Sequence, residues 1–369
     1  MEHILKAELL LTHTQTSLLF SSPILMMVVV AIPGGLIADR IGIRKAAGIG
    51  AIIIAVGTIL RGTATDSSSL LVFTFIYGLG FGLSFPNLPK LVSAWAPREK
   101  AGVATGMFAT GIMTGTALPL ALTMPLIFPV TNTFQGVFFI WSIPPIVAAI
   151  LWWILVREPK HDSIHGEPAS RNKTPLRQVL RNKSLWMVAI LLSLENFFFY
   201  NWSGWSPKLM MLKGATPELA GLITSVTVWT GIPTVLLMPR LAYKLGLRKP
   251  FLWLPSIITV FLTWGAIHIN LSMIWPLMVL VGIATTTRYT TLLALPVELS
   301  HKEGAGTASG LVLSLGYTGG IIGPLVGGRI LDLTGSLDIS LLVLSGVSIA
   351  MVVLALRLPE TGIKPGSKK

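Results

Sequence analysis

The sequence predicts an all-α polytopic membrane protein, built as two pseudo-symmetric six-helix bundles with the first helix apparently missing, so that eleven helices span the bilayer. Three observations predict this fold: the composition, the alternation of basic segments and an internal repeat. Of the 369 residues, 52% are hydrophobic and 12% are charged, and the mean hydropathy is +0.74. A soluble domain carries about 25% charged residues, so this composition suits lipid rather than water.

Eleven stretches are long and apolar enough to cross a bilayer, which requires roughly 20 mostly apolar residues. Most of them are apolar around the whole helix rather than along one stripe, as expected for helices that contact both lipid and a bundle. Their internal Gly and Pro residues are tolerated in membrane helices. In chain order, the predicted helices lie at 18–38, 46–64, 69–94, 102–128, 134–156, 184–210, 218–238, 250–269, 272–296, 305–331 and 337–357.

Basic residues occupy every second connection between these stretches. Of the 28 Lys and Arg residues, 22 lie in or beside the segments that follow residues 38, 94, 156, 238, 296 and 357. Cytoplasmic loops carry the excess of Lys and Arg, so these segments, the C-terminus among them, are predicted to be cytoplasmic in a protein of the cell membrane. The +13 net charge then reflects topology, since the basic residues form no single patch for nucleic acid.

A polar segment, 157–183, divides the chain near its middle. Its Pro, Ser and charged residues indicate a flexible linker, so the predicted domains are an N-terminal bundle at 1–156 and a C-terminal bundle at 184–369. His161 and His165 within it are interpreted as solvated side chains rather than metal ligands. The chain has no cysteine, which excludes disulfides and thiolate sites, and neither a metal nor a cofactor is expected.

The two sides of the linker repeat each other at an offset of about 204 residues. ADRIGIRK (38–45) aligns with AYKLGLRK (242–249), and GVATG aligns with GTASG at the same offset. Internal repeats of this kind are found in secondary transporters. The same offset puts the counterpart of the helix at 184–210 before residue 1. Either the chain starts further upstream, or the protein lacks a first helix.

The segment GLIADRIGIRK (35–45) joins the first two predicted helices. It resembles the signature loop of the major facilitator superfamily, with isoleucines at 37 and 43 as mild departures. Glycines let two helices and a tight turn approach closely, and a carboxylate at a helix end can bond basic groups or a helix N-terminus. The resemblance implies that the loop stabilises the outward-open state; the alternative is that its basic residues only set topology. The expected gating residues are Gly35, Asp39, Arg40, Gly42, Arg44, Lys45 and, in the next cytoplasmic loop, Arg98.

Two charged residues, Arg288 and Glu195, lie well inside predicted helices. A charge there costs about 2.5–3.5 kcal/mol on insertion scales, which marks it as functional. The resemblance implies that both face a central cavity lined by the first, fourth, seventh and tenth helices of the superfamily. A buried guanidinium can clamp an anion, and a buried carboxylate can carry a coupled proton. The alternative is a Glu195–Arg288 ion pair that contacts no substrate.

Further substrate contacts are expected on the helices at 184–210 and 69–94. Asn196 and Tyr200 lie close to Glu195 in sequence. On the other helix, Ser84 is the repeat counterpart of Arg288, and Asn87 lies one turn further on. The prolines of FPNLPK (85–90) are expected to break that helix and free carbonyl groups toward the cavity.

Two groups of residues are interpreted as structural rather than as substrate-binding residues. Trp202 and Trp205 lie near the outer end of a span, where tryptophan usually forms an aromatic belt at the membrane interface. The glycines from Gly319 to Gly328 look like the Gly-Pro motif that proton-coupled antiporters of the superfamily carry in their fifth helix. Here that helix reads GTALP (115–119), so close helix packing is the favoured explanation.

Three short motifs refine the resemblance within the superfamily. WSPKL (205–209), FPNLPK (85–90) and the R-x-P start of the linker look similar to the cyanate and nitroimidazole permease branch, with nitrate/nitrite porters as cousins. This branch and the arginine within a span favour a small anion as the substrate.

The sequence thus predicts a secondary active transporter that moves a small solute, an anion, by alternating access and with proton coupling. No nucleotide-binding Gly-Lys loop is present, which argues against ATP as the direct energy source. No catalytic constellation lies outside the membrane, so an enzyme is not expected. The expected partners are the small-molecule substrate, a proton and the lipid bilayer. Two alternatives stay open: a multidrug or metabolite exporter of the same superfamily, and a non-transporting membrane sensor or remnant without the first helix.

Overall fold

The computed structural model describes residues 2–88, 95, 101–157, 180–300 and 305–362. All regular secondary structure in these ranges is helical, and eleven helical segments in them are long and apolar enough to cross a membrane. The predicted all-α fold with eleven spans is confirmed. Most of the predicted linker, 158–179, lies outside the described residues.

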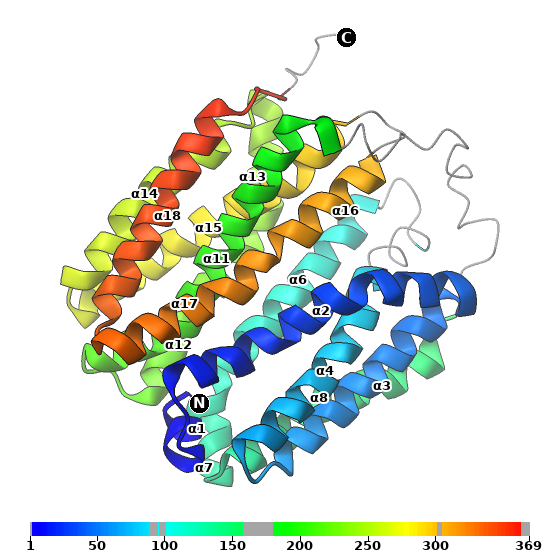
Figure 1. The fold of residues 1–369 in the computed structure, drawn as a ribbon, viewed down its shortest axis with the longest axis vertical. Coiled ribbons are helices and arrows are strands. Elements are labelled where there is room, and N and C mark those ends of the chain that lie inside the picture. Colours follow the sequence, from blue (N-terminus) through cyan, green and yellow to red (C-terminus); the bar gives the residue numbers. More distant parts are fainter. Residues whose placement is uncertain (1, 89–94, 96–100, 158–179, 301–304, 363–369) are drawn as a thin grey trace. The chain divides into compact units, whose positions relative to one another are not determined.

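The chain separates into two compact units (Figure 1). Unit 1 comprises Met1–Gly111 and Ala121–Gly166, and unit 2 comprises Ile112–Leu120 and Glu167–Lys369. The middle of the helix Ala101–Leu122 therefore groups with unit 2. The boundaries that the sequence predicts for the two bundles, at 156 and 184, stay predictions.

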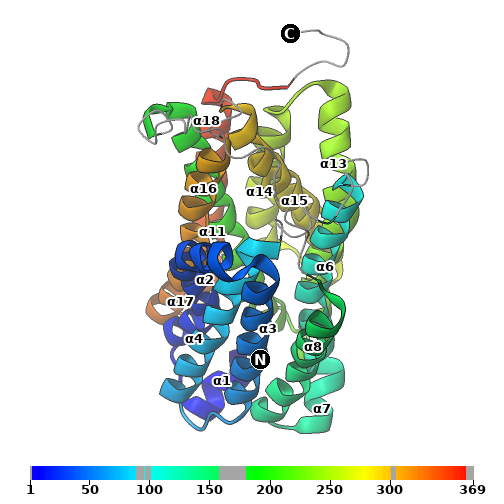
Figure 2. The same cartoon turned by 90° about the vertical axis from the view of Figure 1, so that its right-hand side faces the viewer.

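In unit 1, helix α3 packs along both α4 and α8, and α2 packs along α4 (Figures 1 and 2). A short helix that the sequence did not predict, α1, precedes them. The helices are α1 (Glu2–Leu9), α2 (His13–Ile41), α3 (Ile43–Gly62), α4 (Ser67–Ser84), α6 (Ala101–Leu122), α7 (Phe128–Thr131) and α8 (Phe134–Leu155).

Local sequence sets both ends of α4. Asp66 caps its N-terminus, because its carboxylate accepts the backbone N–H groups of Ser68 at 2.8 Å and Ser69 at 2.9 Å. The hydrogen bond from the Ser69 backbone holds the pKa of Asp66 below its ordinary value. The α-helix ends at Ser84 and continues as a 3-10 turn, Phe85–Asn87, that contains Pro86. The expected break at Pro86 is confirmed, and Pro89 lies outside the described residues.

In unit 2, α14 packs along α18 and α15, while α11 packs along α16 and α17 (Figure 1). Two predicted single helices are each divided in two, at Thr230 and at Tyr317. The helices are α11 (Lys183–Leu212), α12 (Pro217–Trp229), α13 (Gly231–Leu245), α14 (Pro250–His268), α15 (Ile274–Glu298), α16 (Ala305–Gly316), α17 (Thr318–Thr334) and α18 (Leu337–Arg357).

The internal repeat is visible in the packing of each unit. At the offset of 204 residues, α3, α4 and α8 correspond to α14, α15 and α18, and the pairs α3–α8 and α14–α18 are both closely packed. Gly42 and its counterpart Gly246 both have positive φ, 93° and 64°, which an L side chain rarely adopts. Equivalent glycines thus turn the chain between equivalent helices, as a duplication predicts.

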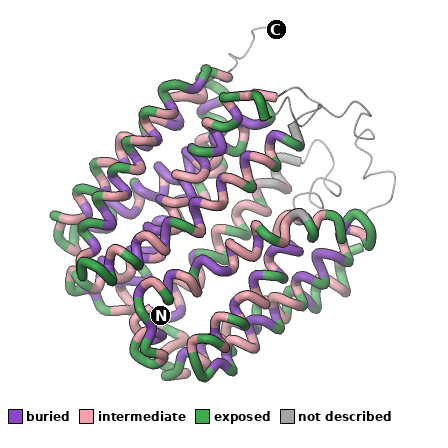
Figure 3. The backbone as a smooth tube through the Cα atoms, viewed as in Figure 1, coloured by how far each residue is buried: buried purple, intermediate pink, exposed green. Residues whose placement is uncertain are grey.

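Buried and exposed positions alternate along the helices of both units (Figure 3). The fully buried side chains of unit 2 include Phe198 from α11, Ile223 from α12 and Met278 from α15. Large apolar side chains such as Ile154 and Phe261 are 69% and 67% exposed. An apolar outer surface on helices of this length is what contact with lipid requires.

Candidate functional site

The two charges that the sequence places inside spans meet in the interior of unit 2. Arg288 lies in α15 and Glu195 in α11, and each residue is 1% exposed. Arg288 Nε donates to Glu195 Oε2. Arg288 Nη1 donates to the carbonyl of Pro255 at 3.1 Å and to Thr259 Oγ1 at 2.9 Å. The guanidinium therefore joins three helices, α11, α14 and α15.

The surroundings of this pair are polar on one side and aromatic on the other. The ring of Phe198 lies 5.3 Å from the centre of the Arg288 guanidinium, in the range of a cation–π contact. Thr259 also donates to Ser348 Oγ of α18 at 3.1 Å. Hydroxyl groups of α14 and α18 thus extend the polar interior away from the guanidinium.

Each member of the pair keeps one buried polar atom without a partner among the described residues. These atoms are Glu195 Oε1 and Arg288 Nη2. Buried polar groups are normally hydrogen-bonded, so an unpaired one needs an explanation. A carboxylate oxygen can accept a proton, and a guanidinium N–H can donate to an anion. The pair can therefore still accept a proton, at Glu195, and donate a hydrogen bond to an anion, from Arg288.

The glycine-rich helix α17 packs closely on α11. An added Cβ would meet the carbonyl oxygen of Ser193 at Gly319 and that of Phe197 at Gly323. Asn201 Nδ2 donates to the carbonyl of Gly323 at 2.7 Å. The expected packing role of the Gly-Pro segment is confirmed.

Asn196, an expected substrate contact, has its amide committed to the protein. Its Nδ2 donates to the carbonyl of Gly316 at 3.0 Å, and its side chain is buried. Gly316 is the last residue of α16, directly before the break at Tyr317. Asn196 therefore holds the end of α16 against α11.

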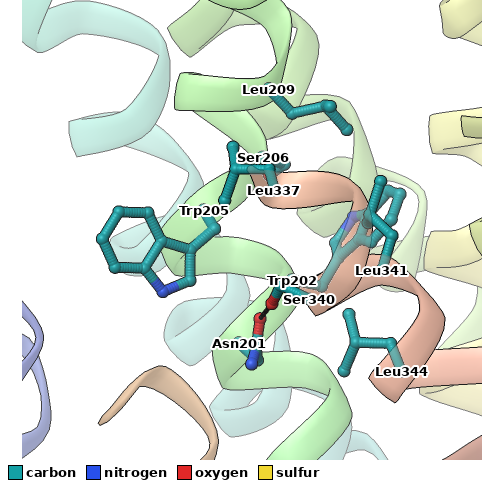
Figure 4. Close-up of a pocket in the computed structure, with 9 residues that line it drawn as sticks. All are labelled: Asn201, Trp202, Trp205, Ser206, Leu209, Leu337, Ser340, Leu341 and Leu344. Atoms are coloured by element: carbon teal, nitrogen blue, oxygen red, sulfur yellow. Dashed lines mark hydrogen bonds between the residues drawn. The ribbon is translucent and has the colours of Figure 1, made fainter. Parts of the chain in front are cut away.

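Trp202 and Trp205 of α11 do not form an interface belt, so that prediction was wrong. Trp202 is 2% exposed and Trp205 is 6% exposed, and Trp205 Nε1 donates to the carbonyl of Pro324 at 3.2 Å. Position along the span suggested the interface, but the side chains point into the α11–α17–α18 packing. With Asn201, Ser340 and five other residues they line a cavity of about 10 Å³ (Figure 4), which is about the size of one water molecule.

Three tyrosines gather beside the ion pair, and the sequence predicted only one of them, Tyr200. Tyr289 follows Arg288 in α15, and its hydroxyl lies 2.9 Å from the hydroxyl of Tyr317, at the α16–α17 break. The Tyr200 ring lies against Gly320, and all three side chains are partly buried. The sequence could have indicated Tyr289, because it directly follows a charged residue within a span.

Ser84 and Asn87 belong to unit 1, whereas the other four expected substrate contacts belong to unit 2. Ser84 Oγ donates to the carbonyl of Ala47 at 3.0 Å. Asn87 Nδ2 donates to the carbonyl of Leu83 at 2.9 Å, and Asn87 Oδ1 is buried without a partner among the described residues. The structure thus brings together Glu195 and Arg288 directly. It bonds Ser84 to α3, and it bonds Asn87 to α4 and, at 3.5 Å, to the carbonyl of Gly34 in α2.

The charged segment 35–45, which forms the end of α2 and the start of α3, is tied to α8. Arg44 Nη2 donates to the carbonyl of Trp153 at 3.0 Å, and Trp152 Nε1 donates to the carbonyl of Arg44 at 3.0 Å. In unit 2, Lys249 Nζ donates to the carbonyl of Leu356, near the end of α18, at 2.9 Å. Each copy of the loop thus provides a cation for the C-terminal end of the last helix in its unit, which suits the helix dipole.

Of the remaining residues of the expected gate, four lie in α2 or at the start of α3. Gly35 lies within α2, and Asp39, Arg40 and Lys45 have exposed side chains. Arg98 lies outside the described residues. Within the described ranges, no group of three or more His, Asp or Glu residues could hold a metal ion.

A model of the family described as Major Facilitator Superfamily matches residues 2–324 and 207–369. The chain belongs to this superfamily. It is a multi-pass membrane transporter, and the prediction that it is not an enzyme is confirmed by this membership.

Individual relatives of the superfamily are distant but cover most of the chain. The hexuronate transporter of Bacillus subtilis strain 168 is 25% identical over 378 residues, 93% of this chain and 85% of the relative. The 2-nitroimidazole transporter of Escherichia coli strain K12 is 25% identical over 355 residues, 94% of this chain and 86% of the relative. The predicted similarity to nitroimidazole permeases is confirmed.

The fold also matches a solved structure whose sequence is only distantly related. A bacterial homolog of the human lysosomal transporter Spinster, in an inward-facing and occupied conformation, matches with a TM-score of 0.71 at 16% identity. The match covers 96% of this chain and 89% of the other. This match shows that the chain has the same fold, and its membership of the superfamily makes it a secondary transporter.

Proposed function

We propose that this transporter moves a small anion together with a proton, with Glu195 as the proton carrier and Arg288 as the source of positive charge. The observation that carries the proposal is the buried Glu195–Arg288 pair, in which each residue keeps one unpartnered polar atom. A pair with a purely structural role would be expected to satisfy these atoms, since unpaired buried polar groups are costly.

Charge balance explains why the anion and the proton would travel together. With both side chains ionised, the pair is neutral. Protonation of Glu195 leaves the charge of Arg288 uncompensated, and binding of one anion restores neutrality. The empty site and the site loaded with both ligands are therefore neutral, whereas a site with one ligand carries a net charge inside the membrane, which is costly. Alternating access favours the two neutral states.

The relatives support a small polar solute. Hexuronate, named for one relative, is an anion. The 2-nitroimidazole named for the other is a weak acid that is neutral in acidic solution. An exporter of neutral compounds is therefore the competing function, and charge selectivity separates the two.

The same proposal assigns the other expected residues. Asn196, Tyr200, Ser84 and Asn87 shape or contact the substrate path, and Asn87 Oδ1 is a further buried acceptor without a partner among the described residues. The loop 35–45 acts as the gate of its face, supported by the bond from Arg44 to the end of α8.

Uptake by the purified protein in liposomes tests this function. Radiolabelled glucuronate, cyanate and acetate are compared with 2-nitroimidazole at an acidic external pH, which keeps this weak acid neutral, with the interior made alkaline or left at the external pH. We expect at least one anion to accumulate under the imposed gradient to a higher level than in protein-free liposomes, into which acetic acid diffuses unaided, and a protonophore to abolish the accumulation. Transport of 2-nitroimidazole alone, or anion uptake that ignores the pH gradient, would contradict the proposal.

A further inference from the structure

The three tyrosines beside the ion pair present hydrogen-bond donors that no described protein group uses. In the Tyr289–Tyr317 pair one hydroxyl donates to the other, so the accepting hydroxyl keeps its own hydrogen free. Neither residue has another hydrogen-bond partner in the described part of the chain, and Tyr200 has none there at all. Two phenolic O–H groups therefore have no acceptor among the residues that the structure describes.

The position of the Tyr289–Tyr317 pair is fixed by the surrounding backbone. Tyr317 occupies the break between α16 and α17. On one side of it, Asn196 binds the carbonyl of Gly316 at 3.0 Å. On the other side, the hydroxyl of Thr318 lies 3.3 Å from that of Ser193 in α11. The hydroxyl of Tyr317 is thus held where it meets Tyr289 of α15, because α11 anchors the break on both sides.

Arg288 alone provides too few donors for an anion. Its Nε and Nη1 are bonded to Glu195, Pro255 and Thr259, and only Nη2 has no partner. A carboxylate has about four lone-pair positions to satisfy. Neutral hydroxyl donors can meet this demand without changing the net charge of the site.

The location of the tyrosines also connects them to the proton carrier. Tyr289 lies close enough to Glu195 for electrostatic interaction. An anion bound at the tyrosine hydroxyls would be repelled by an ionised Glu195 through the low-dielectric interior. A protonated Glu195 removes that repulsion, so an anion at this position favours protonation.

We infer that the hydroxyls of Tyr200, Tyr289 and Tyr317 form the donor site for the acceptor atoms of the transported anion. The inference rests on the proposed function and adds to it the position of the anion. Arg288 provides the positive charge and Glu195 carries the proton. The tyrosine hydroxyls donate hydrogen bonds and so select a ligand that has acceptor atoms. The ligand class is a small oxyanion or pseudohalide, such as a carboxylate or cyanate.

Thermal unfolding of the purified protein with defined salts tests the site. A ligand that binds only the folded protein raises its unfolding temperature. Sodium glucuronate, cyanate and acetate are each compared with sodium chloride at equal ionic strength. The variants are Tyr289→Phe and Tyr317→Phe, which remove one oxygen and keep the ring. Tyr243→Phe is the matched control, since Tyr243 is 65% exposed on α13.

We expect at least one salt to stabilise the wild type, and each site variant to bind it about tenfold more weakly, as for a lost hydrogen bond to a charged ligand. The control should bind as the wild type does. If the same salt stabilises both site variants as strongly as the wild type, the tyrosine site is wrong and anion transport stands. If no salt stabilises the wild type, the proposed anion function fails, and the tyrosine site fails with it. Two separate variants keep the test decisive if one does not fold.

Discussion

The Glu195–Arg288 pair joins two charged residues that lie 93 positions apart in the sequence, on different helices. Removing one partner of a buried ion pair leaves an uncompensated charge and typically costs about 3–5 kcal/mol. Replacing both partners by uncharged side chains of similar size is often neutral, because no charge is then buried. The pair thus contributes to stability chiefly because each charge neutralises the other.

The Arg288→Met variant should therefore be strongly destabilised, and the Glu195→Gln/Arg288→Met variant should recover most of the loss. The single variant strands a carboxylate beside Phe198, whereas the double variant buries no charge. Thermal unfolding in detergent, followed by intrinsic fluorescence, measures both. A double variant that is no more stable than Arg288→Met would show that the hydrogen bonds to α14, and not the charge balance, carry the stability.

At the scale of elements, the close packing of α17 on α11 depends on glycines, which have no side chain. An added Cβ at Gly319 would meet backbone atoms of Ser193, which cannot move without shifting α11. Overpacking of this kind costs about 1–3 kcal/mol. Gly346 in α18, by contrast, has nothing within 4 Å of an added Cβ.

Gly319→Ala should accordingly lower the thermal midpoint, and Gly346→Ala should leave it unchanged or raise it slightly, since Ala is the better helix former. The two substitutions are chemically identical, so propensity alone predicts equal effects. Equal midpoints for the two variants would contradict the close approach of α17 to α11.

The N-terminus of α4 gives a pH-dependent test of a single cap. The folded-state pKa of Asp66 is lowered by its hydrogen bond from the Ser69 backbone. A lowered folded pKa means that the cap stabilises fully above the unfolded pKa of Asp and is lost as the pH falls through the folded pKa. Asp66→Ala should therefore lower the midpoint at pH 7 and have a smaller effect near pH 3. Asp66→Asn, which caps at any pH, should show no such convergence.

At the scale of the whole molecule, the distribution of basic residues predicts which loops face the cytoplasm. The chain has no cysteine, so single cysteines report position cleanly. Thr65→Cys, between α3 and α4, should react with a membrane-impermeant maleimide in intact cells. Tyr243→Cys, 65% exposed at the end of α13, should react only after permeabilisation. The opposite pattern would invert the predicted topology.

The spans, the duplication and the helix break at Pro86 could be predicted because they depend on local composition and on proline geometry. The role of Gly319 was also predictable, since small residues at helical spacing indicate close packing. The buried positions of Trp202 and Trp205 were not, because depth along a span does not determine which side of the helix faces the bundle. Tyr289 and Tyr317 were missed for a related reason: their contact depends on where α11 anchors the α16–α17 break.

The most direct test of the central claim separates exchange from accumulation in the Glu195→Gln variant. The amide is neutral, as the protonated carboxyl is, so the variant should still exchange labelled for unlabelled anion across the liposome membrane. It should fail to accumulate the anion under an alkaline interior, because it cannot release a proton. Full pH-driven accumulation by the variant would contradict Glu195 as the carrier, and loss of exchange in a variant that still unfolds cooperatively would contradict the charge-balance mechanism.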